Sequence, residues 1–230
     1  MTDAERENEK KRAKDLGASI GGILAILLGL ALSGSTPASP LLWDPGTGRY
    51  IFEGHYVSAE TVRNEMLRLR TNVGNRMART TDRFTAGEIS IDQWKDEIKG
   101  FVASSHILAA ALASGSIAFA FDDPAVESRI ESEMKFADGF ADDIRKKKLR
   151  TPTIKSRARS YMQAAIVTFA VVTHAVKKAV GYTEARRHPT AAESCRGCLD
   201  YANEWMDIDA IPQIGTLQCG PRCLCWMEYR

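Results

Sequence analysis

Hydrophobic residues recur at helical spacing through much of residues 58–180, and this pattern predicts a body of long amphipathic helices. The first predicted helix follows Ser58, a residue type that caps helix N-termini, and it ends before Gly87. A second helix is predicted to begin after Ser90, because Ser90 and Gln93 have the spacing of a capping box. Each of these segments carries an apolar stripe that is broad enough to pack on a neighbouring helix.

Two further helices are predicted by their start signals. Asp123 precedes Pro124, and proline is favoured in the first turn of a helix because the N–H that it lacks would be unpaired there. Thr151 and Pro152 mark the start of the fourth helix, which continues through a broad apolar run at residues 166–176. Four long helices predict a bundle, so the expected fold class is mainly α.

The segment ahead of the bundle predicts a small β-hairpin. Residues 34–40 are rich in Ser, Gly and Pro, a composition that is typical of a linker. Residues 41–51 then place Asp-Pro-Gly between two short runs that contain hydrophobic residues, and this tripeptide favours a tight turn. We expect the aromatic residues Trp43, Tyr50 and Tyr56 to cover one end of a small core, and an aromatic ligand platform is the alternative.

The N-terminal region joins a charged leader to an apolar segment at residues 16–32 that contains no charged residue. Its length is short for a membrane span, which takes about 20 residues. Small residues recur there at every fourth position, a spacing that lets helices approach one another closely in lipid. Three interpretations fit: a membrane-inserted helix, a helix buried in an oligomeric contact, and a secretory signal. The small residues are Gly17, Gly21, Ala25, Gly29 and Ser33.

The net charge of +2 is uninformative, but charge is distributed unevenly along the chain. Acidic residues dominate residues 122–143, whereas Arg145 begins a basic segment in which no acidic residue occurs before Glu184. The basic residues could pair with the acidic helix before them, or they could contact the phosphates of DNA or an acidic partner. Pairing with the acidic helix is favoured, because a run of basic residues alone is weak evidence for a DNA-binding surface. This basic patch consists of Arg145, Lys146, Lys147, Lys148, Arg150, Lys155, Arg157 and Arg159.

All five cysteines lie close together at the C-terminal end of the chain. Cys195 and Cys198 form a CxxC pair, and Cys219, Cys223 and Cys225 follow as CxxxCxC. This clustering predicts a local zinc site, with Cys195, Cys198 and Cys219 as three ligands and either Cys223 or Cys225 as the fourth. One or two disulfides, or plain buried thiols, are the alternatives, although an odd cysteine count disfavours a fully paired set.

No catalytic motif accompanies these features. The sequence contains no GxSxG, no glycine-rich phosphate loop and no HExxH. A cysteine inside a CxxC pair close to three other cysteines is better explained as a ligand or a disulfide partner than as a nucleophile. The sequence therefore predicts a protein that is not an enzyme.

The cysteine-rich end resembles the C-terminal domain of phage head-morphogenesis proteins, the minor head or minor capsid family that includes the phage Mu F-like type. The shared features are the CxxC pair, the Pro- and Gly-containing loop at residues 211–215, and a CxC that leads into a closing strand at residues 224–229. The chain departs from the family in having Cys219 where many relatives have a His. It also lacks the Asp-Arg-Thr sequence before the CxxC, where residues 184–188 stand instead. The resemblance covers roughly residues 150–230.

The resemblance implies a virion protein of the capsid interior or portal that acts in head assembly or genome delivery. Its implied partners are portal or capsid proteins and further copies of itself, with packaged DNA as a further possible contact. Residues 16–32 would pack between copies or enter the host membrane during genome delivery. The expected organisation is a leader with its apolar helix and linker (1–40), a hairpin and helical bundle (41–181), and a cysteine-rich α+β module (182–230). The alternatives are a zinc-stabilised nucleic-acid-binding protein and a membrane-anchored helical protein unrelated to virions.

Overall fold

The structure, a computed structural model, describes residues 41–47, 49–52, 54–147, 149–190, 194–220 and 223–230. The predicted leader, the apolar helix at 16–32 and Lys148 of the basic patch lie outside the described residues. None of the helices in these described ranges has both the length and the apolar character that a membrane crossing requires.

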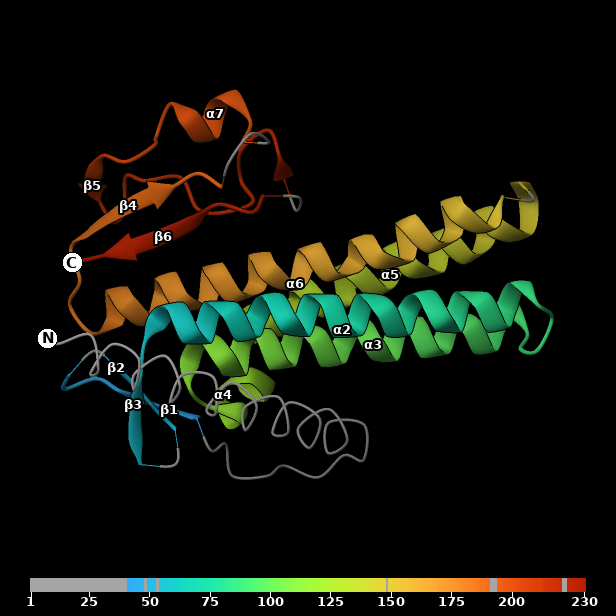
Figure 1. The fold of residues 1–230 in the computed structure, drawn as a ribbon, viewed down its shortest axis with the longest axis horizontal. Coiled ribbons are helices and arrows are strands. Elements are labelled where there is room, and N and C mark those ends of the chain that lie inside the picture. The colour runs from blue at the N-terminus through green and yellow to red at the C-terminus, as the bar shows by residue number, and fades with distance from the viewer. Residues whose placement is uncertain (1–40, 48, 53, 148, 191–193, 221–222) are drawn as a thin grey trace, which may run out of the picture.

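Four long helices make up the body of the protein and confirm the prediction of a mainly helical fold. Figure 1 shows them running along the long axis of the molecule. Helix α3 packs on α2, α5 and α6, and α2 also packs along α6. The four helices are α2 (Ala59–Thr85), α3 (Ile91–Ser114), α5 (Pro124–Lys147) and α6 (Thr151–Ala179).

Side-chain caps fix the starts of α2 and α3, as the sequence predicted. The Ser58 hydroxyl accepts a hydrogen bond from the Thr61 backbone N–H at 3.0 Å. Ser90 and Gln93 form the reciprocal capping box, with the Ser90 N–H donating to Gln93 Oε1 at 2.8 Å and the Gln93 N–H donating to Ser90 Oγ at 3.2 Å. These bonds satisfy backbone donors that the first turn leaves unpaired.

The core of the bundle is mostly apolar, and some of its buried polar groups are hydrogen-bonded. Trp94 and Phe140 are fully buried, and their rings meet edge to face with centroids 5.8 Å apart. The Trp94 indole N–H donates to the Thr81 hydroxyl at 3.1 Å. This bond matters because a buried donor without an acceptor costs about 1–3 kcal/mol.

A three-stranded antiparallel sheet precedes the bundle, with strand order β1-β2-β3. The predicted hairpin is confirmed as β1 (Leu41–Asp44) and β2 (Arg49–Phe52), while β3 (His55–Val57) was not predicted. The sheet covers one end of the core, where the Tyr50 hydroxyl donates to the Ala113 carbonyl at 2.8 Å. A short helix, α4 (Ile117–Asp122), lies between α3 and α5 and was also not predicted.

The C-terminal module, residues 182–230, is the predicted small α+β unit. Its sheet has the order β5-β4-β6, with the central strand β4 antiparallel to both neighbours. Figure 1 shows the module above the C-terminal end of α6, and the N-terminal sheet on the other side of the same end of the bundle. The elements are β4 (Glu184–His188), α7 (Arg196–Leu199), β5 (Trp205–Asp207) and β6 (Trp226–Tyr229).

Candidate metal centre in the C-terminal module

The CxxC segment folds as the sequence predicts for a pair of ligands. Cys195 is the N-cap residue of α7, and the backbone N–H of Cys198 donates to the Cys195 carbonyl at 2.9 Å. This tight turn brings both sulfurs to one side of the loop. The remaining three cysteines lie on the segment that leads into β6.

The structure brings all five cysteine sulfurs into one cluster. Cys195, Cys198 and Cys219 form one group, and Cys198, Cys223 and Cys225 form a second; within each group the sulfurs lie within 4.8 Å of one another. The Cys198 sulfur belongs to both groups. It lies 3.4 Å from the Cys219 sulfur and 3.7 Å from the Cys223 sulfur.

These distances fit a metal–thiolate site. Tetrahedral zinc with Zn–S bonds of about 2.3 Å separates its sulfurs by about 3.8 Å. All five cysteines are free thiols, and Cys198, Cys223 and Cys225 are buried. Buried sulfurs are shielded from competing water, while the partly exposed Cys195 and Cys219 give a route by which an ion could enter. The cysteine cluster could therefore hold a metal ion.

The thiols differ in how readily they ionise. The backbone N–H of Cys198 lowers the pKa of the Cys195 thiol to about 7. Burial raises the pKa of Cys198 above its ordinary value, and burial likewise raises the pKa of Cys219 to about 12. Without a cation, the cluster therefore holds some sulfurs as thiols. A bound metal ion removes this obstacle because a coordinating thiol is deprotonated outright.

A buried arginine lies against the sulfurs, and sequence reasoning missed it. Arg187 is on β4 and has no exposed surface. Its Nη1 lies 3.5 Å from the Cys198 sulfur and 3.9 Å from the Cys223 sulfur, and its Nη2 donates to the Pro212 carbonyl. The available signal was the alternation along β4, in which Ala185 and Arg187 occupy the buried face.

The loop at residues 211–215 joins the cysteine cluster to the helical body. Ile214 is 2% exposed and packs in the same apolar cluster as Cys198, Cys223 and Cys225. Gly215 follows with φ of 87°, and a β-carbon there would lie 2.7 Å from Val167 Cγ1 of α6. The glycine thus allows the loop to approach α6 more closely than another residue would.

The opposite face of the module's sheet carries a network of charged and aromatic side chains. Arg186 donates to Glu228 through Nε at 3.1 Å, and His188 Nε2 lies 2.8 Å from the same Glu228 oxygen. The His188 ring stacks on Trp226 at 4.1 Å, and the guanidinium of Arg63 on α2 lies 4.6 Å from the centre of the Trp226 ring. Arg63 therefore links the module to the bundle.

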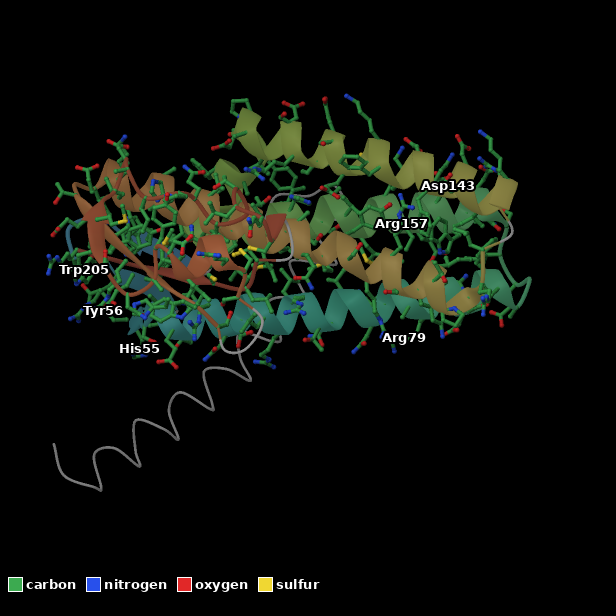
Figure 2. All side chains as sticks on the ribbon, turned by 90° about the horizontal axis from the view of Figure 1, so that it is seen from above. His55, Tyr56, Arg79, Asp143, Arg157 and Trp205 are labelled. Carbon is green, nitrogen blue, oxygen red and sulfur yellow. The ribbon has the colours of Figure 1, made fainter. Side chains whose placement is uncertain are left out.

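The basic patch divides into paired and unpaired residues. Arg145 pairs with Asp142 at 2.8 Å and with Asp92, and Lys155 pairs with Asp82. Arg157 lies 3.5 Å from Asp143 and 4.3 Å from the Phe140 ring centre. Figure 2 shows Arg157 and Asp143 together, towards the end of the bundle away from the module.

The other described members of the patch are exposed. Lys146, Arg150 and Arg159 form no ion pair with residues in the described ranges. Lys147 ends α5, and its side chain is outside the described part. The structure therefore brings three of the patch's described side chains into contact with acidic residues of α2, α3 and α5, and leaves three others exposed.

No protein-family model, curated protein or solved structure matches this chain.

Proposed function

We propose that this chain is a non-catalytic structural protein whose C-terminal module is folded by one zinc ion. The observation that supports the proposal is the convergence of five sulfurs in two groups of three that share Cys198, whose sulfur lies 3.4 Å from Cys219 and 3.7 Å from Cys223, near the spacing in a tetrahedral thiolate site. Zinc is favoured because clustered thiolates in tetrahedral sites select zinc or an iron–sulfur cluster, and because structural zinc sites supply folding free energy directly.

In this proposal the zinc ion ties the start of α7 to the segment that leads into β6. Cys195, Cys198 and Cys219 supply three ligands, and Cys223 or Cys225 supplies the fourth. The two segments are joined by only short elements, and a module of this size has room for only small apolar clusters of its own. A metal crosslink would hold it in one shape and present its surface to a partner.

We further propose that the module acts in a phage virion, docking on portal or capsid proteins during head assembly or genome delivery. The support is the sequence resemblance to minor head proteins, which centres on the residues that form the metal centre. Residues 16–32 would then contact neighbouring copies or, on genome delivery, the host membrane.

Mass spectrometry of purified intact particles tests the virion role. The chain should co-purify with particles and remain attached after high-salt washing. A chain recovered only in the host membrane fraction would favour a membrane-anchored protein without a virion role. A chain recovered only with free nucleic acid would favour the nucleic-acid-binding alternative.

A second candidate function is contact with packaged DNA. The supporting observation is the exposed set Lys146, Arg150 and Arg159, which makes no ion pair within the described ranges. Such a site would neutralise phosphates without reading the base sequence, so its affinity would fall steeply with salt. Titration of duplex DNA at two salt concentrations tests it.

A further inference from the structure

The most unusual charged group in the module is the Arg187 guanidinium, which is fully buried on the inner face of β4. In the described part of the chain, no carboxylate forms an ion pair with Arg187. Within the described residues, its hydrogen-bond contacts are the sulfurs of Cys198 and Cys223 and the carbonyl of Pro212. Its Nε atom has no hydrogen-bond partner.

An arginine side chain keeps its charge at any ordinary pH, so burial cannot neutralise it. A buried charge needs an opposite charge close by, because the free energy of desolvation is otherwise uncompensated. Neutral thiols or a disulfide would give the guanidinium only weak acceptors. Thiolates that carry negative charge would give it both charge compensation and charge-assisted hydrogen bonds.

We propose that Arg187 is the charge partner of an anionic metal–thiolate core, and that it couples this core to the loop at residues 211–215. This inference rests on the proposed zinc site. A zinc ion bound by four thiolates carries net negative charge, and the guanidinium at 3.5 Å from Cys198 offsets part of it. The positioning role resembles that of outer-shell groups that hydrogen-bond to metal ligands.

The other guanidinium nitrogen, Nη2, connects the cysteine cluster to the helical body of the protein. Arg187 Nη2 donates to the carbonyl of Pro212. Pro212 lies three residues before Gly215, the residue that packs against Val167 of α6. The Arg187 side chain therefore contacts the cysteine sulfurs on one side and the loop at residues 211–215 on the other. Metal loading should order this loop, and loss of the metal should loosen the contact between the module and α6.

The buried Arg187 guanidinium also bears on whether the cysteines bind a metal ion or form disulfides. Oxidation of the cluster to neutral disulfides would leave the buried guanidinium without a counter-charge, whereas zinc binding keeps every ligand sulfur anionic. Arg187 thus favours a reduced, metal-bound cluster over a disulfide-bonded one.

The test measures zinc affinity in the full-length chain by competition with a chromophoric chelator. Arg187→Met removes the charge and keeps the length of the side chain, and Arg187→Lys keeps a charge but loses the planar fork. The matched control is Arg186→Met, on the adjacent residue of β4 whose side chain points to the opposite face and pairs with Glu228.

We expect Arg187→Met to weaken zinc binding by about 10- to 100-fold, Arg187→Lys to weaken it less, and Arg186→Met to leave it within about twofold of wild type. Equal zinc affinity in wild type and Arg187→Met would overturn the inference while leaving the zinc site in place. If wild type itself binds no zinc, the proposed function fails instead.

A second measurement is needed if the Arg187→Met variant does not fold. The rise in melting temperature on adding zinc reports the coupling between zinc and residue 187 in any variant that folds with the metal. This rise should be smaller for Arg187→Lys than for wild type and for an Arg186→Lys control. An identical rise in all three would also overturn the inference.

Discussion

Gly215 packs against Val167 so closely that an added β-carbon would lie 2.7 Å from Val167 Cγ1. The contact joins the loop beside the metal centre to the middle of α6. It identifies the place where the C-terminal module docks on the bundle.

We expect Gly215→Ala to destabilise the protein. The methyl group would both overpack against Val167 and sit on a backbone with φ of 87°. The control is Gly181→Ala, which has a similar φ of 94° but no heavy atom within 4 Å of the added carbon. Chemical denaturation should show a loss about 1–3 kcal/mol larger for Gly215→Ala, the usual range for overpacking. Equal losses in the two variants would show that the loop does not dock on α6 as described.

Among the five cysteines, Cys198 should be the most important for metal binding because its sulfur belongs to both sulfur groups. We expect Cys198→Ser to abolish stoichiometric zinc binding. Of Cys223→Ser and Cys225→Ser, one should retain zinc, and that result identifies the fourth ligand. Metal content of each purified variant is the measurement. Full zinc occupancy in Cys198→Ser would contradict the site.

His106 should make the protein less stable in acid. It is 1% exposed, and its Nδ1 lies 2.8 Å from the Thr168 hydroxyl. Burial lowers the pKa of His106 from 6.5 to about 4, so between these values the unfolded chain binds a proton that the folded chain does not. Stability is therefore lost as pH falls from 6.5 towards 4, by about 3 kcal/mol from this group.

The variant His106→Gln isolates this contribution. Its free energy of unfolding should depend less on pH between 6.5 and 4 than that of wild type. Parallel pH profiles for wild type and His106→Gln would contradict the assignment.

The basic patch should separate into structural and surface residues. We expect the double variant Lys155→Gln/Arg157→Gln to lose stability, by about 0.2–1 kcal/mol for each ion pair. The triple variant Lys146→Gln/Arg150→Gln/Arg159→Gln should keep its stability and lose any salt-dependent affinity for duplex DNA. DNA binding that is insensitive to salt, or is unchanged in the triple variant, would remove the patch from consideration as a DNA contact.

The proposed membrane contact of residues 16–32 can be tested by liposome flotation. The full-length chain should float with vesicles of bacterial lipid composition, whereas a chain that begins at Ser35 should not, because it lacks the apolar segment. Equal flotation of both chains would end the membrane proposal. If neither chain floats but only the full-length chain forms oligomers in solution, contact between copies would be favoured instead.

The helical body was predictable because its signals are local. The hydroxyl of Ser58 and the Ser90–Gln93 pair act within one turn, and the apolar stripe of each helix follows from the spacing of neighbouring residues. The third strand and α4 were missed because each is short, three residues for β3 and six for α4, and carries too little periodic pattern to be recognised. Strand β6 begins at Trp226, two residues later than predicted, and such end positions depend on pairing with β4.

The cysteine cluster was predictable only in its members. The CxxC and CxxxCxC spacings can be recognised directly in the sequence. The proximity of these cysteines to Arg187 depends instead on strand β4, which pairs with β5 and β6. Within Glu-Ala-Arg-Arg-His, the alternation that places Arg187 on the face of Ala185 can be read only once the segment is known to be a strand, because an arginine on the buried face is unusual. Alternation along the strand places the two arginines on opposite faces, and the packing of the module's sheet decides which face is buried.

The most direct measurement is elemental analysis of the purified full-length chain, combined with thiol counting after denaturation in chelator. We expect one zinc ion for each chain and five free thiols once the metal is removed. Protein without metal, in which sulfurs are paired as disulfides, would contradict it.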